Sequence, residues 1–563
     1  MKVKFLFLIA SAFLFLNFTM SDKKPERFSK PHEEEAEENK TEFRSFMNYT
    51  PEYSSSVFVN YNISRDSSPQ NETSIKISRT DPNRVVAAWR DFRKGVSPAN
   101  RKVGYSYSTD AGQTWSASLL LDSTLLPGGL IRNSDPAVAV DGLGNFYIAV
   151  IALTNTNGNG TLGVYKSTDG GATFPMAFIA SQTGSEDKEY ITCDLNPSSP
   201  RYNTLYMSWT TFSNDIANLL TKSTNGGVNW TTGVQFNEPE NVGQGSDVAV
   251  SSNGDINICW LTGDFTNDII AFDKSTDGGQ TFGTDVMISQ GITPDIPITT
   301  SGVTFPSIAT DISGGVNDGN LYVTWCDARN GDPDVFLSRS TNRGVNWSAP
   351  LRINDDVSGN GKLQCWPWIE VNDSGNIAIV YYDSRNSASP TIIDAYLAHS
   401  TDGGLSFDNF RLSTQNFPTN QPNSAVRFGD YIGIDYYRNN IIPVWCDERS
   451  GGFNTEAYTA IVATPVTISN LTSIMPEGFE LKQNYPNPFN PTTKLGFGIS
   501  NAGFVTLKIY NALGIEVETL VNENLNPGRY EVEFTGSGHN SGVYFYKLQT
   551  ENFSDTKRMI LIK

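Results

Sequence analysis

Four short segments of the chain carry an aspartate and an arginine at a fixed spacing that suits ligand binding. Three follow the pattern Trp-x-Asp-x-Arg and one has Tyr in place of Trp; they comprise Trp89, Asp91 and Arg93, Trp325, Asp327 and Arg329, Trp445, Asp447 and Arg449, and Tyr381, Asp383 and Arg385. The guanidinium fork of arginine binds carboxylates and sugar hydroxyls through paired hydrogen bonds. The pattern therefore predicts a charged face that grips such groups.

A structural role is the alternative for the same arginines. An acid stands at the start of the next predicted strand after three of them: these acids are Asp334, Asp394 and Glu456, and they could pair with Arg329, Arg385 and Arg449 respectively. Such ion pairs would satisfy the arginines within the fold. They would then leave no free guanidinium for a ligand.

Glu370 lies beside Trp366, Pro367 and Trp368, and aromatic clusters of this kind stack on sugars. The alternative is that the same rings pack against neighbouring strands. In seven corresponding strands the position of Glu370 is small or short in five and is Lys76 in another. Lys76 and Glu370 therefore either pair, meet water in a channel, or belong to a site.

Further polar residues stand just before or at the start of predicted strands. They are Arg132, Asp135, Asp247, Arg427, Asp430 and Tyr431. Hydrolysis of a glycosidic bond needs two carboxyl groups, or a tyrosine with its base, on either side of the bond. Glu370 with Tyr431, and one of the aspartates as acid, form the set to test, but we assign no catalytic residue.

Composition narrows the classes of function. The net charge is −19, from 60 acidic and 41 basic residues, which argues against a nucleic-acid-binding surface. The three histidines are scattered, so they predict neither a catalytic triad nor a metal site, and we expect no metal and no cofactor. The five cysteines include no CxxC pair, which favours buried free thiols.

One octapeptide, Ser-x-Asp-x-Gly-x-Thr-Trp, recurs six times with first serines 59, 56, 52, 65 and 60 residues apart. This period fits one four-stranded blade of a propeller. The characteristic positions are Ser108, Asp110, Gly112 and Trp115; Ser167, Asp169, Gly171 and Phe174; Ser223, Asn225, Gly227 and Trp230; Ser275, Asp277, Gly279 and Phe282; Ser340, Asn342, Gly344 and Trp347; and Ser400, Asp402, Gly404 and Phe407.

The octapeptide resembles the Asp-box, or bacterial neuraminidase repeat. The resemblance implies a turn between the third and fourth strands of each blade. The residue types suit a turn, because a short Asp or Asn side chain bonds turn amides and glycine adopts positive φ. Asn225 and Asn342 replace the usual aspartate, and Arg343 replaces the first glycine. We expect a structural role rather than calcium or ligand binding.

The sequence has seven segments typical of inner strands but only six boxes, and the last unit has no box and no fourth strand. Residues 57–64 resemble the outer strands of other units, so we predict that they close blade seven. The sequence thus predicts an all-β fold, with a seven-bladed β-propeller over residues 56–464. In a propeller, loops between second and third strands share one face with the blade-to-blade loops, and the boxes lie on the other. The Trp-x-Asp-x-Arg segments belong to the former face.

The two ends of the chain carry export features. Residues 1–21 have Lys2 and Lys4 before a short apolar run, which is typical of a signal peptide. The run is too short to span a membrane, so we expect no transmembrane anchor. Residues 22–55 are rich in charge and predict a solvated, disordered leader. Residues 465–480 predict a linker to a C-terminal domain.

Residues 481–563 contain alternating strands such as 505–510, which predict a small Ig-like β-sandwich. The run Lys-Gln-Asn-Tyr-Pro-Asn-Pro-Phe-Asn-Pro-Thr-Thr over 482–493, the strand 542–548 and the terminal 557–563 resemble the type A sorting domain of the bacterial type IX secretion system. The resemblance implies that type IX machinery is a partner and that the protein is secreted or attached to the outer cell surface. An ordinary accessory Ig-like module is the alternative.

The Asp-boxes also invite comparison with sialidases, but only the boxes carry that resemblance. The nearest approach to the Arg-Ile-Pro motif of that family is Leu130–Pro136, which does not match it. We therefore predict a secreted, non-catalytic propeller that binds a glycan or protein ligand. The alternatives are a sialidase-like glycoside hydrolase of the exo-α-sialidase type and an assembly scaffold.

Overall fold

The computed structural model describes residues 58–562, apart from 98–99, 129, 131, 154–159, 213–215, 264–267, 293–303, 420–427, 453, 464–468, 473–477, 526 and 537–538. The predicted signal peptide and the whole of the predicted leader lie outside these residues. The chain divides into two compact units, Met1–Val462 and Ala463–Lys563.

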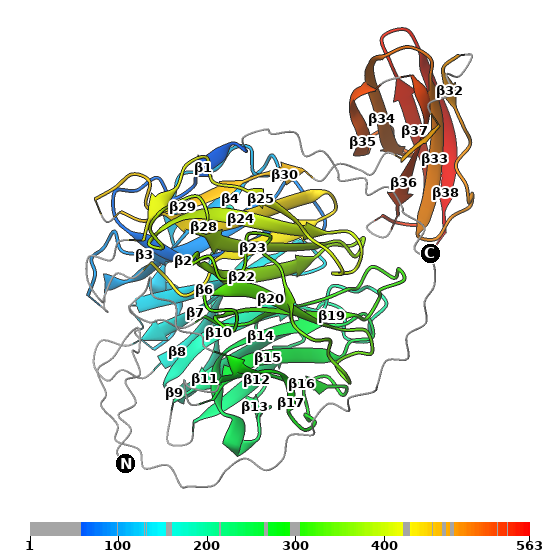
Figure 1. Cartoon of the computed structure of the whole chain (residues 1–563). Coiled ribbons are helices and arrows are strands. Elements are labelled where there is room, and N and C mark those ends of the chain that lie inside the picture. The colour runs from blue at the N-terminus through cyan, green and yellow to red at the C-terminus, as the bar shows by residue number, and fades with distance from the viewer. Residues whose placement is uncertain are drawn as a thin grey trace, which may run out of the picture. The chain divides into compact units, whose positions relative to one another are not determined.

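The first unit is a β-propeller built from antiparallel sheets whose strands follow one another in chain order (Figure 1). Among the described residues there are seven such sheets, which we number as blades in chain order. The strands are β2 (Gln70–Ile77), β3 (Val85–Asp91), β4 (Lys102–Ser108) and β5 (Leu119–Leu120) in blade one; β6 (Arg132–Val140), β7 (Phe146–Leu153), β8 (Gly160–Ser167) and β9 (Met176–Gly184) in blade two; β10 (Glu186–Cys193), β11 (Leu205–Thr211), β12 (Ala217–Ser223) and β13 (Val234–Gln235) in blade three; β14 (Gly243–Val250), β15 (Ile256–Thr262), β16 (Asp268–Ser275) and β17 (Val286–Ile292) in blade four; β18 (Ser307–Thr310), β19 (Leu321–Asp327), β20 (Asp334–Ser340) and β21 (Leu351–Arg352) in blade five; β22 (Gln364–Val371), β23 (Ile377–Asp383), β24 (Ile392–Ser400), β25 (Asp408–Arg411) and β26 (Phe417–Pro418) in blade six; and β27 (Gly433–Tyr437), β28 (Asn440–Asp447), β29 (Glu456–Ala460), β30 (Val462–Ala463) and β1 (Asn60–Asn62) in blade seven. Short 3₁₀ turns lie at Ser123–Leu125 (η2) and Pro239–Asn241 (η3).

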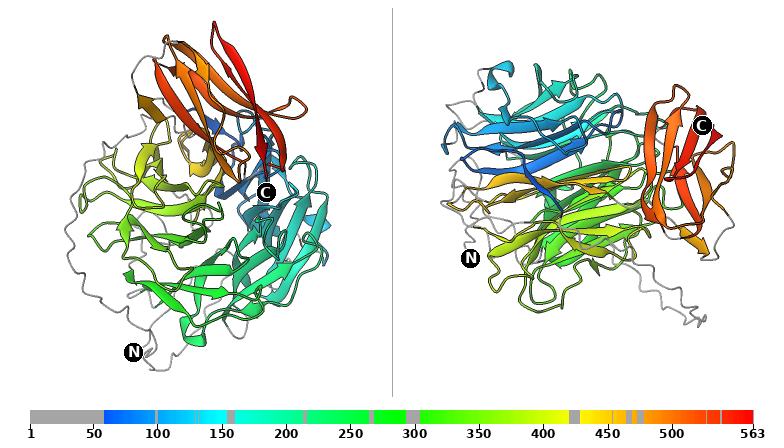
Figure 2. Two further views of the ribbon diagram at one scale, coloured as in Figure 1. Left: turned by 90° about the vertical axis from the view of Figure 1, so that its right-hand side faces the viewer. Right: turned by 90° about the horizontal axis from the view of Figure 1, so that it is seen from above.

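The N-terminal strand β1 belongs to the last blade. It pairs antiparallel with β29, with Asn60 opposite Ala460 and Asn62 opposite Tyr458. The first strand of each blade contacts the first strand of the next, and β27 contacts β2. The left view of Figure 2 shows the blades following one another in chain order around a central axis. The ring is therefore closed by the two ends of the propeller sequence.

Hydrophobic clusters lie between neighbouring blades and hold them together. Val86 and Phe146 belong to the cluster between blades one and two, and Ile75 and Val444 to the cluster between blades one and seven. Five tryptophans at corresponding places in second strands are fully buried: Trp89, Trp209, Trp260, Trp325 and Trp445. Removing such a side chain costs about 3–5 kcal/mol of stability. The five cysteines are buried and unpaired, as predicted.

The six boxes form closely similar turns between the third and fourth strands. In the first, Gly112 N donates to Ser108 Oγ at 2.8 Å, and Thr114 N donates to Asp110 Oδ1 at 2.8 Å. The same two hydrogen bonds recur in the other five boxes. The Ser and Asp or Asn side chains thus satisfy the amides of their own turn, which is structural chemistry.

The second unit is a β-sandwich of two four-stranded sheets. One has the order β31 (Ser469–Thr472), β36 (Gly528–Thr535), β33 (Thr492–Ile499), β32 (Glu480–Leu481); the other has the order β35 (Glu516–Leu525), β34 (Gly503–Asn511), β37 (Gly542–Gln549), β38 (Ser554–Leu561). Leu507, Phe497 and Tyr546 are among the side chains of its core. Because β31 pairs with β36, part of the segment predicted as a linker, 465–480, contributes a strand to the sandwich. No helix in the described part of the chain is long and apolar enough to cross a membrane.

Candidate functional site

The Trp-x-Asp-x-Arg segments form closed clamps at the ends of second strands. In blade five, the fully buried Asp327 accepts hydrogen bonds from Trp325 Nε1 at 2.7 Å and from Arg329 Nε at 2.8 Å and Nη2 at 2.6 Å. The backbone N–H of Arg329 donates to the same carboxylate at 2.9 Å. The clamps of Asp91 and Asp447 repeat these contacts. Asp383 likewise accepts from the backbone N–H and Nε of Arg385.

The predicted partners of these arginines were wrong. Asp334 accepts from Arg352, not Arg329, and Asp394 accepts from Arg411, not Arg385. Glu456 accepts from Ser450 Oγ at 2.9 Å rather than from Arg449. The physical reason is the short reach between residues two apart at the end of a strand, which lets each arginine fold back onto the aspartate of its own clamp.

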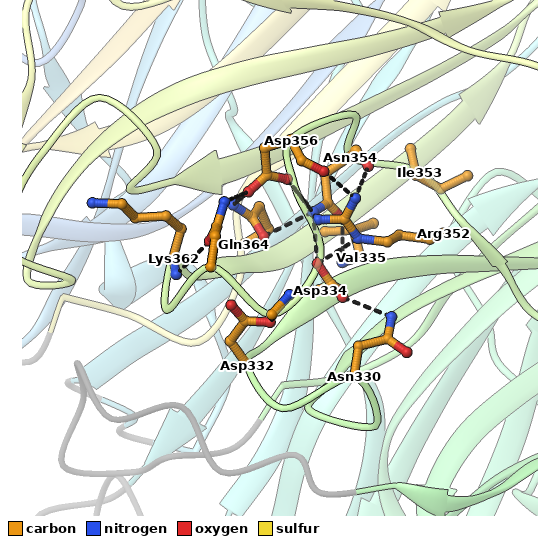
Figure 3. A network of polar contacts seen from close by, with 12 residues as sticks. Asn330, Asp332, Asp334, Val335, Arg352, Ile353, Asn354, Asp356, Lys362 and Gln364 are labelled. Atoms are coloured by element: carbon orange, nitrogen blue, oxygen red, sulfur yellow. Dashed lines mark hydrogen bonds and ion pairs between the residues drawn. The ribbon is translucent and has the colours of Figure 1, made fainter.

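A polar network fixes the connection between blades five and six (Figure 3). Asp334 accepts from Arg352 Nε and Asn354 Nδ2, both at 2.7 Å. Asn354 Nδ2 also donates to Gln364 Oε1 at 2.8 Å, and Gln364 Nε2 donates to Asp383 Oδ1 at 3.1 Å. The network thereby joins the clamp of blade six. Its acids are held by side chains of the fold, which favours a structural role.

Lys76 and Glu370 form an ion pair that spans from blade one to blade six. Asp435 of blade seven lies 3.7 Å from Lys76 Nζ and accepts from Arg79 Nη1 at 2.8 Å. Burial raises the pKa of Glu370, although Lys76 opposes it. Burial also acts on Asp435, but Arg79 and Lys76 outweigh it and hold the pKa of that carboxyl low. This cluster links the blades where the ring closes.

The structure does not bring Glu370 and Tyr431 together by a hydrogen bond in its described part. Tyr431 Oη donates instead to the carbonyl oxygen of Pro136 at 3.3 Å. Trp366 is buried and stacks on Phe428 with ring centroids 6.1 Å apart, so it packs in the core between blades. Trp368 is half-buried and lies 4.9 Å from the ring of Tyr190 and 6.3 Å from that of Tyr431.

A second feature of the face that carries the clamps is a series of β-bulges near the start of first strands. Bulges interrupt the register of β2, β6, β10, β14 and β22. One residue of each has positive φ: Glu72 (55°), Asp135 (55°), Lys188 (54°), Gly245 (69°) and Trp366 (49°). This conformation costs about 1–3 kcal/mol for a residue other than glycine and is frequent at functional sites. Bulges also re-aim side chains there.

Blade four marks the end of the charged bulges. A Cβ on Gly245 would lie 1.9 Å from Phe305 Cδ1 of the connection to blade five. The aromatic ring therefore occupies the space that a bulge side chain would need. The charged bulge residues with positive φ are Glu72, Asp135 and Lys188, in blades one, two and three.

The charged bulges gather further buried or half-buried residues into one group, which we call the bulge cluster: Glu72, Arg90, Arg132, Asp135, Asp187, Lys188, Glu189, Tyr190, Asp430 and Tyr431. Arg90 is saturated, because it contacts Glu72 at 2.8 Å, Asp135 at 3.1 Å and Asn71 at 2.7 Å. Lys188 Nζ lies 3.4 Å from Asp430 and 4.2 Å from the centre of the Tyr431 ring.

Some other members of the bulge cluster have side-chain atoms without a hydrogen-bond partner among the described residues. None of the three guanidinium nitrogens of Arg132 donates a hydrogen bond to a described residue, and neither carboxyl oxygen of Glu189 accepts one from another described residue. The hydroxyl of Tyr190 and the Glu72 oxygen Oε2 are also unpartnered there. These groups are more than nine-tenths buried. Native proteins rarely leave so many buried polar groups unpaired in one place.

Burial sets the pKa values in the bulge cluster. It raises the pKa of Glu72 and of Glu189 well above the ordinary carboxyl value, and that of Asp187 to about 6. It lowers the pKa of Arg132, although Asp135 opposes it. For Asp135 itself, burial acts to raise the pKa, but Arg90, Arg132 and hydrogen bonds with Glu72 and Ser134 together outweigh it and hold the pKa low. Acids with raised and lowered pKa values thus lie side by side, an arrangement typical of functional sites.

Sequence reasoning pointed to Arg132, Asp135, Asp430 and Tyr431 but missed the rest of the bulge cluster. The missed residues are Glu72, Arg90, Asp187, Lys188, Glu189 and Tyr190. A polar run at the start of an otherwise apolar inner strand, as in residues 186–189, was the available signal. Within the described ranges no group of three or more His, Cys, Asp or Glu side chains could hold a metal ion.

Comparisons with known proteins bear on both units. Residues 483–563 match the family described as "Secretion system C-terminal sorting domain", and residues 106–117 match the BNR/Asp-box repeat. No curated protein sequence matches the chain. The match to the sorting domain confirms the resemblance that the sequence shows.

Solved structures with similar folds include three of different origin. A leech intramolecular trans-sialidase has 15% identity over 63% of this chain and 70% of its own, with a TM-score of 0.42. PorZ, a surface component of the type-IX secretion system of Porphyromonas gingivalis, has 14% identity over 89% of this chain and 60% of its own, with a TM-score of 0.39. An α-L-arabinanase of Penicillium chrysogenum has 12% identity over 72% and 97%, with a TM-score of 0.40.

The strand order, the repeated box turns and the family matches agree with one another. The chain is a β-propeller protein with Asp-box repeats and a C-terminal type IX sorting domain, and it is secreted or attached to the cell surface.

Proposed function

We propose that the propeller binds an extracellular glycan or protein ligand at the face where its first strands begin. The observation that carries this proposal is the bulge cluster, in which Arg132, Glu189 and Tyr190 are buried and unpartnered within the described part of the chain. Buried polar groups without partners are costly, and a ligand would satisfy them. The sorting domain supports export to the place where such a ligand would be met.

The clamps have a structural part in this proposal. They were the first candidates for ligand contact, but Asp327 and its counterparts bind their own arginines and indoles. In the proposal they stiffen the ends of second strands in blades one, five, six and seven. They do not contact the ligand.

A glycoside hydrolase of sialidase-like type is the second candidate. The observation that favours it is the group of acids Glu72, Asp187 and Glu189, whose pKa values burial raises. A carboxyl group that stays protonated near neutral pH is what a general acid requires. An assembly scaffold would need a broad patch instead, and no observation on the described residues favours it.

One experiment separates binding from hydrolysis. The purified mature protein is incubated with sialylated mucin glycans, and released sugar and retained glycan are both measured. The variants are Glu189→Gln and, as a matched control on another inner strand, Glu370→Gln. Retention without release supports a binding propeller. Release that Glu189→Gln abolishes and Glu370→Gln preserves supports the hydrolase.

One further outcome would contradict the proposal, and another would narrow it. If only Glu370→Gln abolished release, hydrolysis would take place at the Lys76–Glu370 ion pair and not in the bulge cluster. Neither release nor retention would remove mucin glycans as ligands and leave a protein ligand.

A further inference from the structure

Arg132 is a buried cation whose hydrogen-bonding capacity is unused. It opens β6, and the residue is 1% exposed. None of its guanidinium nitrogens donates a hydrogen bond to a described residue. An arginine stays charged even when burial lowers its pKa. A fold that buries such a group without a partner loses stability, unless something else supplies the acceptors.

Two of the acids whose charge acts on Arg132, Asp135 and Asp187, already have other partners. Asp135 contacts Arg90 at 3.1 Å and accepts a hydrogen bond from Ser134 Oγ. Asp187 accepts from Gln244 Nε2 at 2.8 Å and from the backbone N–H of Lys188 at 3.1 Å. Both acids therefore have other donors, and the Arg132 fork remains open to an anion from outside the chain.

Other members of the bulge cluster supply the hydrogen-bonding groups that a sugar needs. Tyr190 Oη and Lys188 Nζ make no hydrogen bond to described residues and can donate, while Glu189 and the free oxygen of Glu72 can exchange hydrogen bonds with hydroxyls. Burial raises the pKa of both glutamates, so they repel an anion less than ionised carboxylates would.

An apolar surface borders the same groups. The ring centroid of Tyr190 lies 4.9 Å from that of Trp368 and 5.7 Å from that of Tyr431, and the centroids of Trp368 and Tyr431 lie 6.3 Å apart. The three residues come from blade three, blade six and the connection to blade seven. Trp368 is only half-buried. Aromatic faces next to hydrogen-bonding groups suit a ligand that has both hydroxyls and an apolar ring face.

We propose that Arg132 binds the anionic group of an acidic sugar, with Lys188, Glu189 and Tyr190 bonding its hydroxyls and Trp368 flanking its ring. The inference rests on the proposed binding function and adds the ligand class to it. A carboxylate and a sulfate share the geometry that an arginine fork recognises, so either could supply the anion. Arg90 does not bind the anion in this proposal, since its guanidinium group already contacts Glu72, Asp135 and Asn71.

The test measures binding of four saccharides to the mature protein by calorimetry: 3′-sialyllactose, a glucuronate oligosaccharide, a sulfated lactose and neutral lactose. We expect at least one acidic saccharide to bind at least tenfold more tightly than lactose. The three acidic probes tell a carboxylate from a sulfate. Arg132→Met should weaken that binding at least tenfold.

Thermal stability tells a ligand group from a structural one. Because Arg132 is unpartnered, Arg132→Met should leave the melting temperature unchanged or raise it. Arg329→Met, which removes a paired guanidinium from a clamp, should lower it. Arg339→Met removes an arginine that donates to Gly403 O within the sixth box, and it should leave saccharide binding unchanged.

Three outcomes would overturn the inference. A lower melting temperature for Arg132→Met together with unchanged binding would make the arginine structural. Preference for neutral lactose would remove the anion subsite while the proposed binding function stands. Absence of binding to all four saccharides would count against the subsite and against a glycan as the ligand.

Discussion

The clamps and the bulge cluster use the same residue types in opposite ways. In a clamp, one buried aspartate collects the indole of a tryptophan and the fork and backbone N–H of an arginine, as Asp327 does with Trp325 and Arg329. In the bulge cluster, Arg132 and Glu189 remain without such partners among the described residues. Both regions are near the same face, so location alone does not separate structure from function.

The difference lies in how completely the hydrogen bonds are made. A closed set of partners on regular strand ends contributes stability and rigidity. An open set on backbone with positive φ costs stability, and proteins keep it where it serves binding or catalysis. We infer that unmet hydrogen-bonding capacity is a better guide to the site of this protein than motif repetition.

The largest effect should come from opening a clamp. Asp327→Ala leaves the indole of Trp325 and the fork of Arg329 without their acceptor, so we expect a loss of about 3 kcal/mol in the free energy of unfolding. Urea unfolding measures it. Asp81→Ala, which removes an exposed pair with Arg84, should cost less than about 0.5 kcal/mol. Similar losses in the two variants would make the clamp dispensable.

An intermediate effect should appear in the pH dependence of stability. Asp247 is buried and bonded by Ser307 Oγ, Ile308 N and Val248 N, and burial raises its pKa to about 6. Between the unfolded pKa of about 4 and the folded pKa, the folded state holds the extra proton, so stability falls as pH rises through this window.

Asp247→Asn should remove that part of the fall, by about 2 kcal/mol between pH 4 and pH 7. Ser307→Ala removes a hydrogen bond that favours the carboxylate and should make the fall steeper. Urea unfolding at four pH values compares the profiles. If the stability of wild type and of Asp247→Asn changed with pH in parallel, the three neutral donors would stabilise the ionised form of Asp247 as well as an arginine does.

The smallest effect should come from the boxes. Asn225 and Asn342 already make the Ser and amide hydrogen bonds of the turn through Oδ1. Asp277→Asn changes only the 2.6 Å contact with Thr281 Oγ1, so we expect a loss below about 0.5 kcal/mol by urea unfolding. A loss above 1 kcal/mol would mean that the box aspartates do more than shape the turn.

The propeller was readable from the sequence because its signals are local. The box fixes a turn through Ser, Asp or Asn, and Gly within eight residues, and it does so at a regular period. The pairing of the first strand with the last blade followed from a spare outer strand at one end and a missing one at the other, and β1 pairs with β29.

The site was less accessible from the sequence for two physical reasons. Clamp partners depend on side-chain reach at a strand end, which favoured Asp327 over Asp334 for Arg329. The backbone conformation of the charged bulges has no glycine to signal it, since Glu72, Asp135 and Lys188 adopt positive φ where glycine would be expected. Which buried groups stay unpartnered is decided by packing between blades, and the linear order of residues does not record it.

The pairing of β1 with β29 also determines when the propeller can close during synthesis of the chain. Asn60 leaves the ribosome early, but its partner Ala460 follows only after nearly all of the propeller has been made. Until then β1 has no partner strand and the ring cannot close. The finished propeller, with its inner face assembled, therefore forms only after synthesis of that domain is complete.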